Sequence, residues 1–224
     1  MKEEYILYLD ESEFTRSKTF SIGGIALKKK DIDPFSEDVL EIKKVLWSDK
    51  DIKLFNPVLH CTELETVYRN RKKGDNLAES EKRKLSSVYK KLITTLNDEE
   101  MEKKYGQVYG RLSKLVKKYK LTVFCCVIRL AKLKELYFID QNHNGVNLID
   151  DRFNIALQRI IENYTHYLTV VDGYGDVLYE ARNSDGENSP KSPDIRLINN
   201  FHQIHANNRG IRYTSNKVVQ ERNR

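Results

Sequence analysis

Long hydrophobic runs are absent from the 224-residue sequence. A helix that crosses a bilayer needs roughly 20 consecutive apolar residues, and no segment approaches that length. The N-terminal residues MKEEYILYLDES also lack the apolar region of a secretory signal peptide. These absences predict a soluble protein that stays in the cytoplasm and makes no membrane contact.

Cysteine is scarce, and the odd number of three excludes a framework in which every cysteine is paired within the chain. Cys125 and Cys126 are neighbours in the apolar stretch LTVFCCVI, whereas Cys61 stands alone. We therefore expect buried free thiols in a reducing compartment. The sequence also lacks a P-loop, a dinucleotide-binding fingerprint, a nucleophile elbow and an internal repeat, so none of these common arrangements is predicted.

Charged side chains, by contrast, make up 32% of the chain and give it a formal net charge of +6. Lysine and arginine concentrate in residues 69–73, 82–91 and 103–120, where tyrosines and leucines are interspersed. One interpretation is that these segments are solvated helix faces; the other is that they bind DNA or RNA. The positive charge favours a polyanionic partner. An acidic protein partner or a homo-oligomer is an alternative.

Strand-like and helix-like segments alternate along the sequence. Residues 4–10 and 19–29 are close enough to pair as an antiparallel hairpin, with Gly23 and Gly24 marking a bulge or a close backbone approach. The continuous apolar run 121–129 predicts a central strand covered on both faces. A last strand is expected within 169–182, with Gly173 and Gly175 around a turn. Helical spacing predicts helices at 34–47, 79–97, 106–119, 148–167 and from 194 onward.

This alternation predicts the fold class. In the helix at 34–47, Asp33 is expected as N-cap and Pro34 as the first helical residue. Residues 183–193 are rich in Asn, Ser, Gly and Pro, which predicts a flexible loop. Because no linker separates two parts, we expect one α/β domain over residues 1–224, with a mixed sheet covered by helices.

Acidic residues near strand ends are the candidate site. Asp10 and Glu11 follow the first strand, Glu180 belongs to the last strand, and Asp194 opens a helix. Carboxylates that converge at such a place repel one another unless a divalent cation neutralises them, and Mg²⁺ or Mn²⁺ suits oxygen ligands. Such ions could activate water and stabilise the leaving oxygen in phosphodiester cleavage.

Each candidate also has a structural interpretation. Asp10 could form a turn with Ser12, Glu180 could be a surface residue, and Asp194 could serve as a helix N-terminal residue. His60, in the segment VLHCTEL, could be a general base, a metal ligand or a hydrogen-bonded core residue. His202 and His205 have helical spacing, yet no cysteine cluster accompanies them, so a structural zinc site is not predicted.

The chain resembles the prokaryotic family called domain of unknown function 3800. The resemblance is carried by short motifs that occur in the family's order and span most of the chain. They are YLDES (8–12), IGG (22–24), LHCTEL (59–64), YEARN (179–183) and Asp194 before a helix.

The resemblance implies a ribonuclease H-like fold, an acidic site for a divalent metal, and a role near mobile elements or in phage defence. By position, Asp10 is the first-strand acid, Glu180 the acid of the later strand and Asp194 an accompanying acid. Glu11 and His60 lie near them. Members of the family continue into a helix with an Ala-Asp-Leu type motif. This sequence reaches Arg224 without one, which implies a C-terminally truncated member or one completed by another chain.

Two functions follow as hypotheses. The first is a metal-dependent nuclease in which Asp10, Glu180 and Asp194 are the catalytic acids and Glu11 joins them as a metal ligand. In this hypothesis the lysine-rich helices dock the phosphate backbone. The second is a catalytically inactive ribonuclease H-like module that binds or scaffolds; a component that meets an acidic protein is a further alternative.

Overall fold

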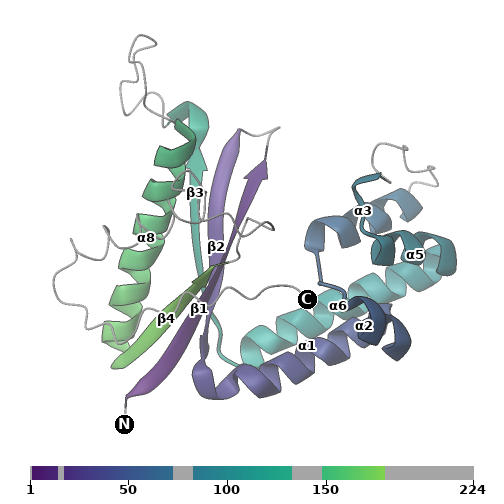
Figure 1. Ribbon diagram of the computed structural model, residues 1–224, viewed down its shortest axis with the longest axis horizontal. Coiled ribbons are helices and arrows are strands. Elements are labelled where there is room, and N and C mark those ends of the chain that lie inside the picture. Colours follow the sequence, from purple (N-terminus) through teal and green to yellow (C-terminus); the bar gives the residue numbers. More distant parts are fainter. Residues whose placement is uncertain (1, 15–17, 73–82, 133–147, 180–224) are drawn as a thin grey trace. The chain divides into compact units, whose positions relative to one another are not determined.

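The computed structural model describes residues 2–14, 18–72, 83–132 and 148–179 (Figure 1). The chain divides into two compact units, each described by itself below. The sheet unit comprises the residues up to Lys30 and those from Leu121 onward, and the helical unit comprises Asp31–Lys120. The expected loop at 183–193 and the expected helix from 194 lie outside the described residues.

A four-stranded mixed sheet forms the centre of the sheet unit, with the strand order β3-β2-β1-β4. β1 pairs with β2 and β2 with β3 in antiparallel fashion, whereas β4 lies parallel to β1. The predicted α/β class and the N-terminal antiparallel hairpin are therefore confirmed. The strands are β1 (Glu3–Phe14), β2 (Thr19–Lys28), β3 (Thr122–Arg129) and β4 (Gly173–Tyr179).

The long helix α8 (Leu148–Val170) packs on one face of this sheet, along β2, β3 and β4. Its prediction at 148–167 is confirmed, with one further turn at the C-terminal end. Alternate side chains of β1, namely Tyr5, Leu7 and Leu9, enter the core beneath α8. From α8, the fully buried side chains are Ala156, Leu157, Ile160 and Ile161.

Glycines let the sheet pack tightly, but they do not interrupt it. The β1–β2 register runs without a bulge from Tyr5↔Lys28 to Phe14↔Thr19. A Cβ atom at Gly24 would overlap the carbonyl oxygen of Tyr8, which confirms the predicted close backbone approach.

Gly173 and Gly175 lie within β4 rather than around a turn, so that prediction is wrong. A Cβ atom at Gly175 would overlap the hydroxyl oxygen of Tyr164 and lie 2.5 Å from the carbonyl oxygen of Tyr5. One from Gly173 would lie 2.9 Å from the ring of Tyr5. Both positions in β4 need glycine because α8 and the ring and backbone of Tyr5 approach the strand too closely for a side chain.

The prediction of a central, doubly covered β3 is also wrong. Among the described strands, β3 stands at an edge of the sheet. Val123 and Val127 are 63% and 60% exposed, and the Cys125 thiol between them is exposed as well. Cys126 is partly buried on the α8 side, and its burial raises the pKa of its thiol. Burial therefore alternates from one residue of β3 to the next, although the residues on both faces are apolar.

Five helices of seven to 21 residues form the described part of the helical unit, preceded by a 3₁₀ turn at Lys29–Asp31. The first begins at Ile32, two residues before the predicted start, so Asp31 rather than Asp33 occupies the N-cap position. The helices are α1 (Ile32–Leu46), α2 (Asp49–Phe55), α3 (Cys61–Lys72), α5 (Ser87–Thr95) and α6 (Asp98–Lys118).

The predicted single helix at 79–97 is interrupted at Leu85–Ser86, and α5 begins only at Ser87. The carboxylate of Glu63 on α3 accepts hydrogen bonds from the backbone N–H of Ser86 at 3.2 Å and from its hydroxyl at 2.8 Å. The next helix, predicted from residue 106, begins at Asp98 because Asn97 and Glu100 form a capping box.

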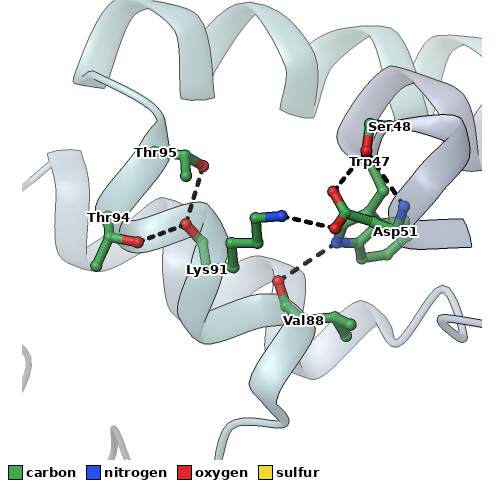
Figure 2. Close-up of polar contacts among 7 residues, drawn as sticks. All are labelled: Trp47, Ser48, Asp51, Val88, Lys91, Thr94 and Thr95. Carbon is green, nitrogen blue, oxygen red and sulfur yellow. Dashed lines mark hydrogen bonds and ion pairs between the residues drawn. The ribbon is translucent and has the colours of Figure 1, made fainter. Parts of the chain in front are cut away.

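A polar network joins α2 to α5 (Figure 2). Ser48 caps α2: its Oγ accepts from the Asp51 N–H at 3.2 Å and donates to Asp51 Oδ2 at 2.7 Å. Lys91 Nζ of α5 donates to Asp51 Oδ1 at 2.6 Å, and Trp47 Nε1 donates to the Val88 carbonyl at 3.4 Å. The bonds from Lys91, and then from Ser48, lower the pKa of Asp51 below its usual value.

Among the described residues, every helix is too short or too polar to cross a membrane.

Gly175→Ala should destabilise the protein by about 1–3 kcal/mol, because the added methyl group overlaps Tyr164 and the β1 backbone. Urea unfolding measures this difference. Gly110→Ala in α6 is the control: its Cβ atom would meet nothing within 4 Å, so helix propensity should leave stability unchanged or raise it by up to about 1 kcal/mol. Equal stability of wild type and Gly175→Ala would contradict this packing.

Asp51→Asn should lower the free energy of unfolding at pH 7, because it removes the charge that Lys91 binds. The folded-state pKa of Asp51 is depressed, so its stabilisation is present above the unfolded-state pKa, about 3.9, and is lost as pH falls through the folded-state value. Unfolding curves for wild type and variant should therefore converge below about pH 4. Glu41→Gln, which alters an exposed pair with Lys44, serves as the control. A difference that persists unchanged into acid would count against the ion pair.

Candidate functional site

Asp10 lies within β1 rather than at its end, because the strand continues for four residues to Phe14. The predicted strand end at residue 10 is therefore wrong. Leu9 is buried beneath α8, so alternation turns Asp10 toward the opposite face of the sheet, where the residue is exposed. The structural alternative of a turn between the hairpin strands does not describe Asp10, which is paired with Gly23 of β2.

Small residues lie beside Asp10 and after it on its face of the sheet, whereas the preceding pair on that face, Tyr8 and Ile25, is large. Gly23 lies directly across on β2 and has no side chain, and Cys125 of β3 lies beyond it in the register. Ser12 and Ser21 form the next pair on this face, where the Ser21 hydroxyl donates to the Ser12 carbonyl at 3.4 Å. Among the described residues, the Glu11 N–H donates a hydrogen bond to Asp10 Oδ1 at 2.7 Å. Within the described part of the chain, the Asp10 carboxylate is therefore accessible from solvent.

Glu11 occupies the other face of β1. It pairs with Ile22, a fully buried core residue, and it is partly buried. Successive residues of a strand point to opposite faces, so the structure does not bring the side chains of Asp10 and Glu11 together. A single metal ion cannot readily contact both carboxylates, because they lie on opposite faces of β1.

The remaining predicted acids, Glu180 and Asp194, lie outside the described residues, as do His202 and His205. The parallel pairing of β1 with β4 is described as far as Leu9↔Tyr179. In the sequence, Asp10 follows Leu9 and Glu180 follows Tyr179. In the sequence, each of the two predicted strand acids therefore directly follows one member of the last described β1–β4 pair.

Within the described ranges, no group of three or more His, Cys, Asp or Glu side chains is arranged to hold a metal ion. Asp10 is the one predicted acid whose side chain is both described and exposed. An exposed carboxylate is a suitable oxygen donor for Mg²⁺ or Mn²⁺, and further donors would have to come from other parts of the chain, the substrate or water.

Two acids that sequence reasoning missed lie at the far end of the same face. Asp176 of β4 pairs with Ile6 of β1, and burial, followed by the nearby charge of Glu4, raises its pKa. Lys29 partly offsets this through its charge, and it binds Glu4 with an Nζ–Oε1 distance of 2.6 Å. The period of two along β1 could have placed Glu4 on the same face as Asp10. Placing Asp176 beside them also required knowing that β4 pairs with β1.

His60 belongs to the helical unit, where it immediately precedes α3 and is exposed. Its backbone N–H donates to the Tyr89 hydroxyl at 2.7 Å, and that hydroxyl donates to the Val58 carbonyl at 3.1 Å. His60 Nδ1 lies 2.8 Å from the Thr62 hydroxyl. Of the three predicted roles, the core residue is excluded by this exposure.

The LHCTEL segment is held in place by α5. Tyr89 is 1% exposed, and burial raises its pKa to about 12, so its hydroxyl stays protonated at neutral pH. Glu63 fixes the start of α5 through Ser86, as described above. These contacts explain the short motif as a helix junction, independently of any chemistry of His60 or Cys61.

Tyr89→Phe should destabilise the protein by about 1–3 kcal/mol, because it leaves the His60 N–H and the Val58 carbonyl without their shared hydroxyl. Urea unfolding gives the global effect, and faster hydrogen exchange at the His60 amide gives the local one. Tyr174→Phe, at a position that is 40% exposed, is the matched control and should leave both unchanged. Unaltered exchange at His60 in Tyr89→Phe would show that the hydroxyl does not hold this segment.

Comparisons of the chain with protein-family models, with curated proteins and with solved structures found no match.

Proposed function

We propose that this protein is a divalent-metal-dependent nuclease of ribonuclease H-like type that acts on DNA or RNA. Asp10 is the central metal ligand, Glu180 is the acid of the neighbouring strand, and Asp194 accompanies them. Mg²⁺ or Mn²⁺ is the metal. A role near mobile elements or in phage defence follows from the family resemblance alone.

One observation carries the proposal: Asp10 is exposed on the sheet face opposite α8, beside a strand position that lacks a side chain. A carboxylate so placed is accessible to a metal ion and to a large substrate. The mixed sheet and its antiparallel N-terminal hairpin agree with the ribonuclease H-like expectation. The register is described as far as Leu9↔Tyr179, and in the sequence Asp10 and Glu180 each follow a member of that pair, which is why we assign both acids to one site.

The chain's own residues have defined tasks in this proposal. Asp10 and Glu180 hold the metal with carboxylate oxygens, and β1 keeps Asp10 in place through the packing of Leu7 and Leu9 beneath α8. A bound divalent ion would supply activation of water and stabilisation of the leaving oxygen. Glu11 lies on the other face of β1, so we do not assign it as a direct ligand of the metal.

Asp10→Asn should abolish metal binding while preserving the fold, because the change is nearly isosteric and the side chain is exposed. In thermal-shift titrations, Mn²⁺ should raise the apparent stability of the wild type by about 2.7 kcal/mol at 100 times Kd and leave the variant unshifted. Cleavage of labelled DNA and RNA should disappear in parallel.

Asp172→Asn is the matched control, because Asp172 is an exposed aspartate of the same unit that pairs with Lys2. Its backbone has a positive φ of 48°, which asparagine tolerates. This variant should keep the metal shift and the cleavage. An undiminished Mn²⁺ shift in Asp10→Asn would refute the assignment of Asp10. Metal-independent binding of nucleic acid without cleavage would instead identify a binding module.

A further inference from the structure

One exposed strip of α6 combines lysines with two glycines, and neither contributes to packing among the described residues of the helical unit. Its residues follow one another three or four positions apart and therefore share a helix face. All of them are exposed. We call this the lysine–glycine strip; it consists of Lys103, Gly106, Gly110, Lys114 and Lys117.

The lysines of this strip carry uncompensated positive charge. Lys103, Lys114 and Lys117 make no ion pair within the described part of the chain, unlike Lys118, which binds Asp38 at 2.5 Å. Residues 111–120 contain five basic side chains and no acidic one. At 1.5 Å per residue, the strip is about 21 Å long. It is therefore a narrow band of positive charge with the dimensions of a short polyanion.

Bare helix backbone lies between the lysines. A Cβ atom at Gly106 or Gly110 would meet nothing within 4 Å, so no packing within the described part of the chain requires glycine at either position. Glycine in a helix interior is unfavourable relative to alanine. The glycines alone would indicate no ligand, but here they leave a path along the lysines on which a polymer backbone can approach the helix closely.

A tyrosine ladder ends beside the strip: Tyr109 is the i,i+3 neighbour of Gly106, and the other rings extend from it toward α3. The rings of Tyr68 on α3 and Tyr105 on α6 stack at a centroid distance of 4.0 Å and an angle of 10°, and Tyr109 continues the ladder at 4.7 Å from Tyr105. Tyr109 is 36% exposed, so the ladder has an accessible end. The contact with the Tyr105 ring holds the ring of Tyr109 at the end of the ladder.

We propose that the lysine–glycine strip and the tyrosine ladder form a binding surface for single-stranded nucleic acid. The phosphates follow the lysines over the glycines, and a base stacks on Tyr109 at the end of the ladder. Positive grooves flanked by aromatic rings bind single strands in this way, because every base has a stacking face. Duplex bases are already stacked, so a duplex gains only the charge contribution.

An acidic protein would be attracted by the same lysines, but it would not use the ladder. The aromatic end of the ladder therefore favours nucleic acid over an acidic peptide. The inference deepens the proposed function by giving the nuclease a single-stranded substrate class, and it rests on that function only for the assumption that nucleic acid is the substrate.

The test measures binding of the full-length protein in EDTA at about 50 mM salt, so that no metal site takes part. The probes are fluorescein-labelled oligo(dT) of 20 nucleotides, an abasic strand of equal length and charge, and a 20-base-pair duplex. Wild type should bind oligo(dT) about tenfold more tightly than the abasic strand, as expected for one stacked base. Tyr109→Leu should lose this preference, whereas Tyr174→Leu, at an exposed tyrosine outside the ladder, should retain it.

Two further variants separate the strip from the ladder. Gly110→Leu adds bulk where a Cβ atom would meet no described atom within 4 Å, so it should fold normally and weaken binding of both single strands. Lys114→Gln should lower the slope of log affinity against log salt by roughly 0.7 for oligo(dT). Because Gly110→Leu does not touch the ladder, it keeps the test valid if Tyr109→Leu fails to fold.

Equal affinity for oligo(dT) and the abasic strand in wild type would overturn the proposal, as would a duplex bound as tightly as oligo(dT). Competition by polyglutamate as effective as competition by unlabelled oligo(dT) would identify an acidic protein as the partner. Binding without cleavage in Mg²⁺ would refute the nuclease and leave this surface intact, whereas cleavage without the base preference would refute this surface alone.

Discussion

The alternation of side chains along β1 is the constraint on which the sheet unit depends. Leu7 and Leu9 are buried beneath α8, so the residue that follows them must face the other way. A slip of one residue would bury Asp10 and expose the leucines, which makes the register costly to change. Since β1 pairs with both β2 and β4, the same packing also sets the positions of their residues. Hydrophobic burial thus determines which face presents the carboxylate.

The helical unit is organised by polar contacts that start and stop helices. Ser48 caps α2, and Asn97 with Glu100 caps α6, each satisfying backbone N–H groups that a helix start leaves free. Glu63 of α3 binds the residue at which α5 begins, and Tyr89 of α5 holds the segment before α3. α3 and α5 therefore fix each other's N-termini. This reciprocity explains why the LHCTEL segment is well defined although it is largely exposed.

Sequence periodicity predicted the elements better than their limits or surroundings. The α/β class, the hairpin and α8 were predictable because their apolar residues repeat with the correct period. The interruption at Ser86 was not, because its cause is a glutamate 23 positions earlier. The covering of β3 was also unpredictable, since TVFCCVIR is apolar on both faces and the sequence does not say which face a helix occupies. At the candidate site, the opposite orientations of Asp10 and Glu11 could not be predicted, because the sequence did not show that β1 continues past them to Phe14.

Glycine shows most clearly why sequence alone underdetermines function. At Gly24 and Gly175 a Cβ atom would overlap neighbouring atoms, so packing explains the residue completely. At Gly23 the nearest atom to a Cβ would be the Phe124 carbonyl oxygen at 3.8 Å, an ordinary contact, yet the position borders Asp10. At Gly106 and Gly110 no atom of the described residues lies within 4 Å of a Cβ, although each glycine costs about 1 kcal/mol relative to alanine in a helix. Packing within the described residues therefore explains Gly24 and Gly175 but not Gly106 and Gly110, where it is the neighbouring lysines and Tyr109 that indicate a ligand.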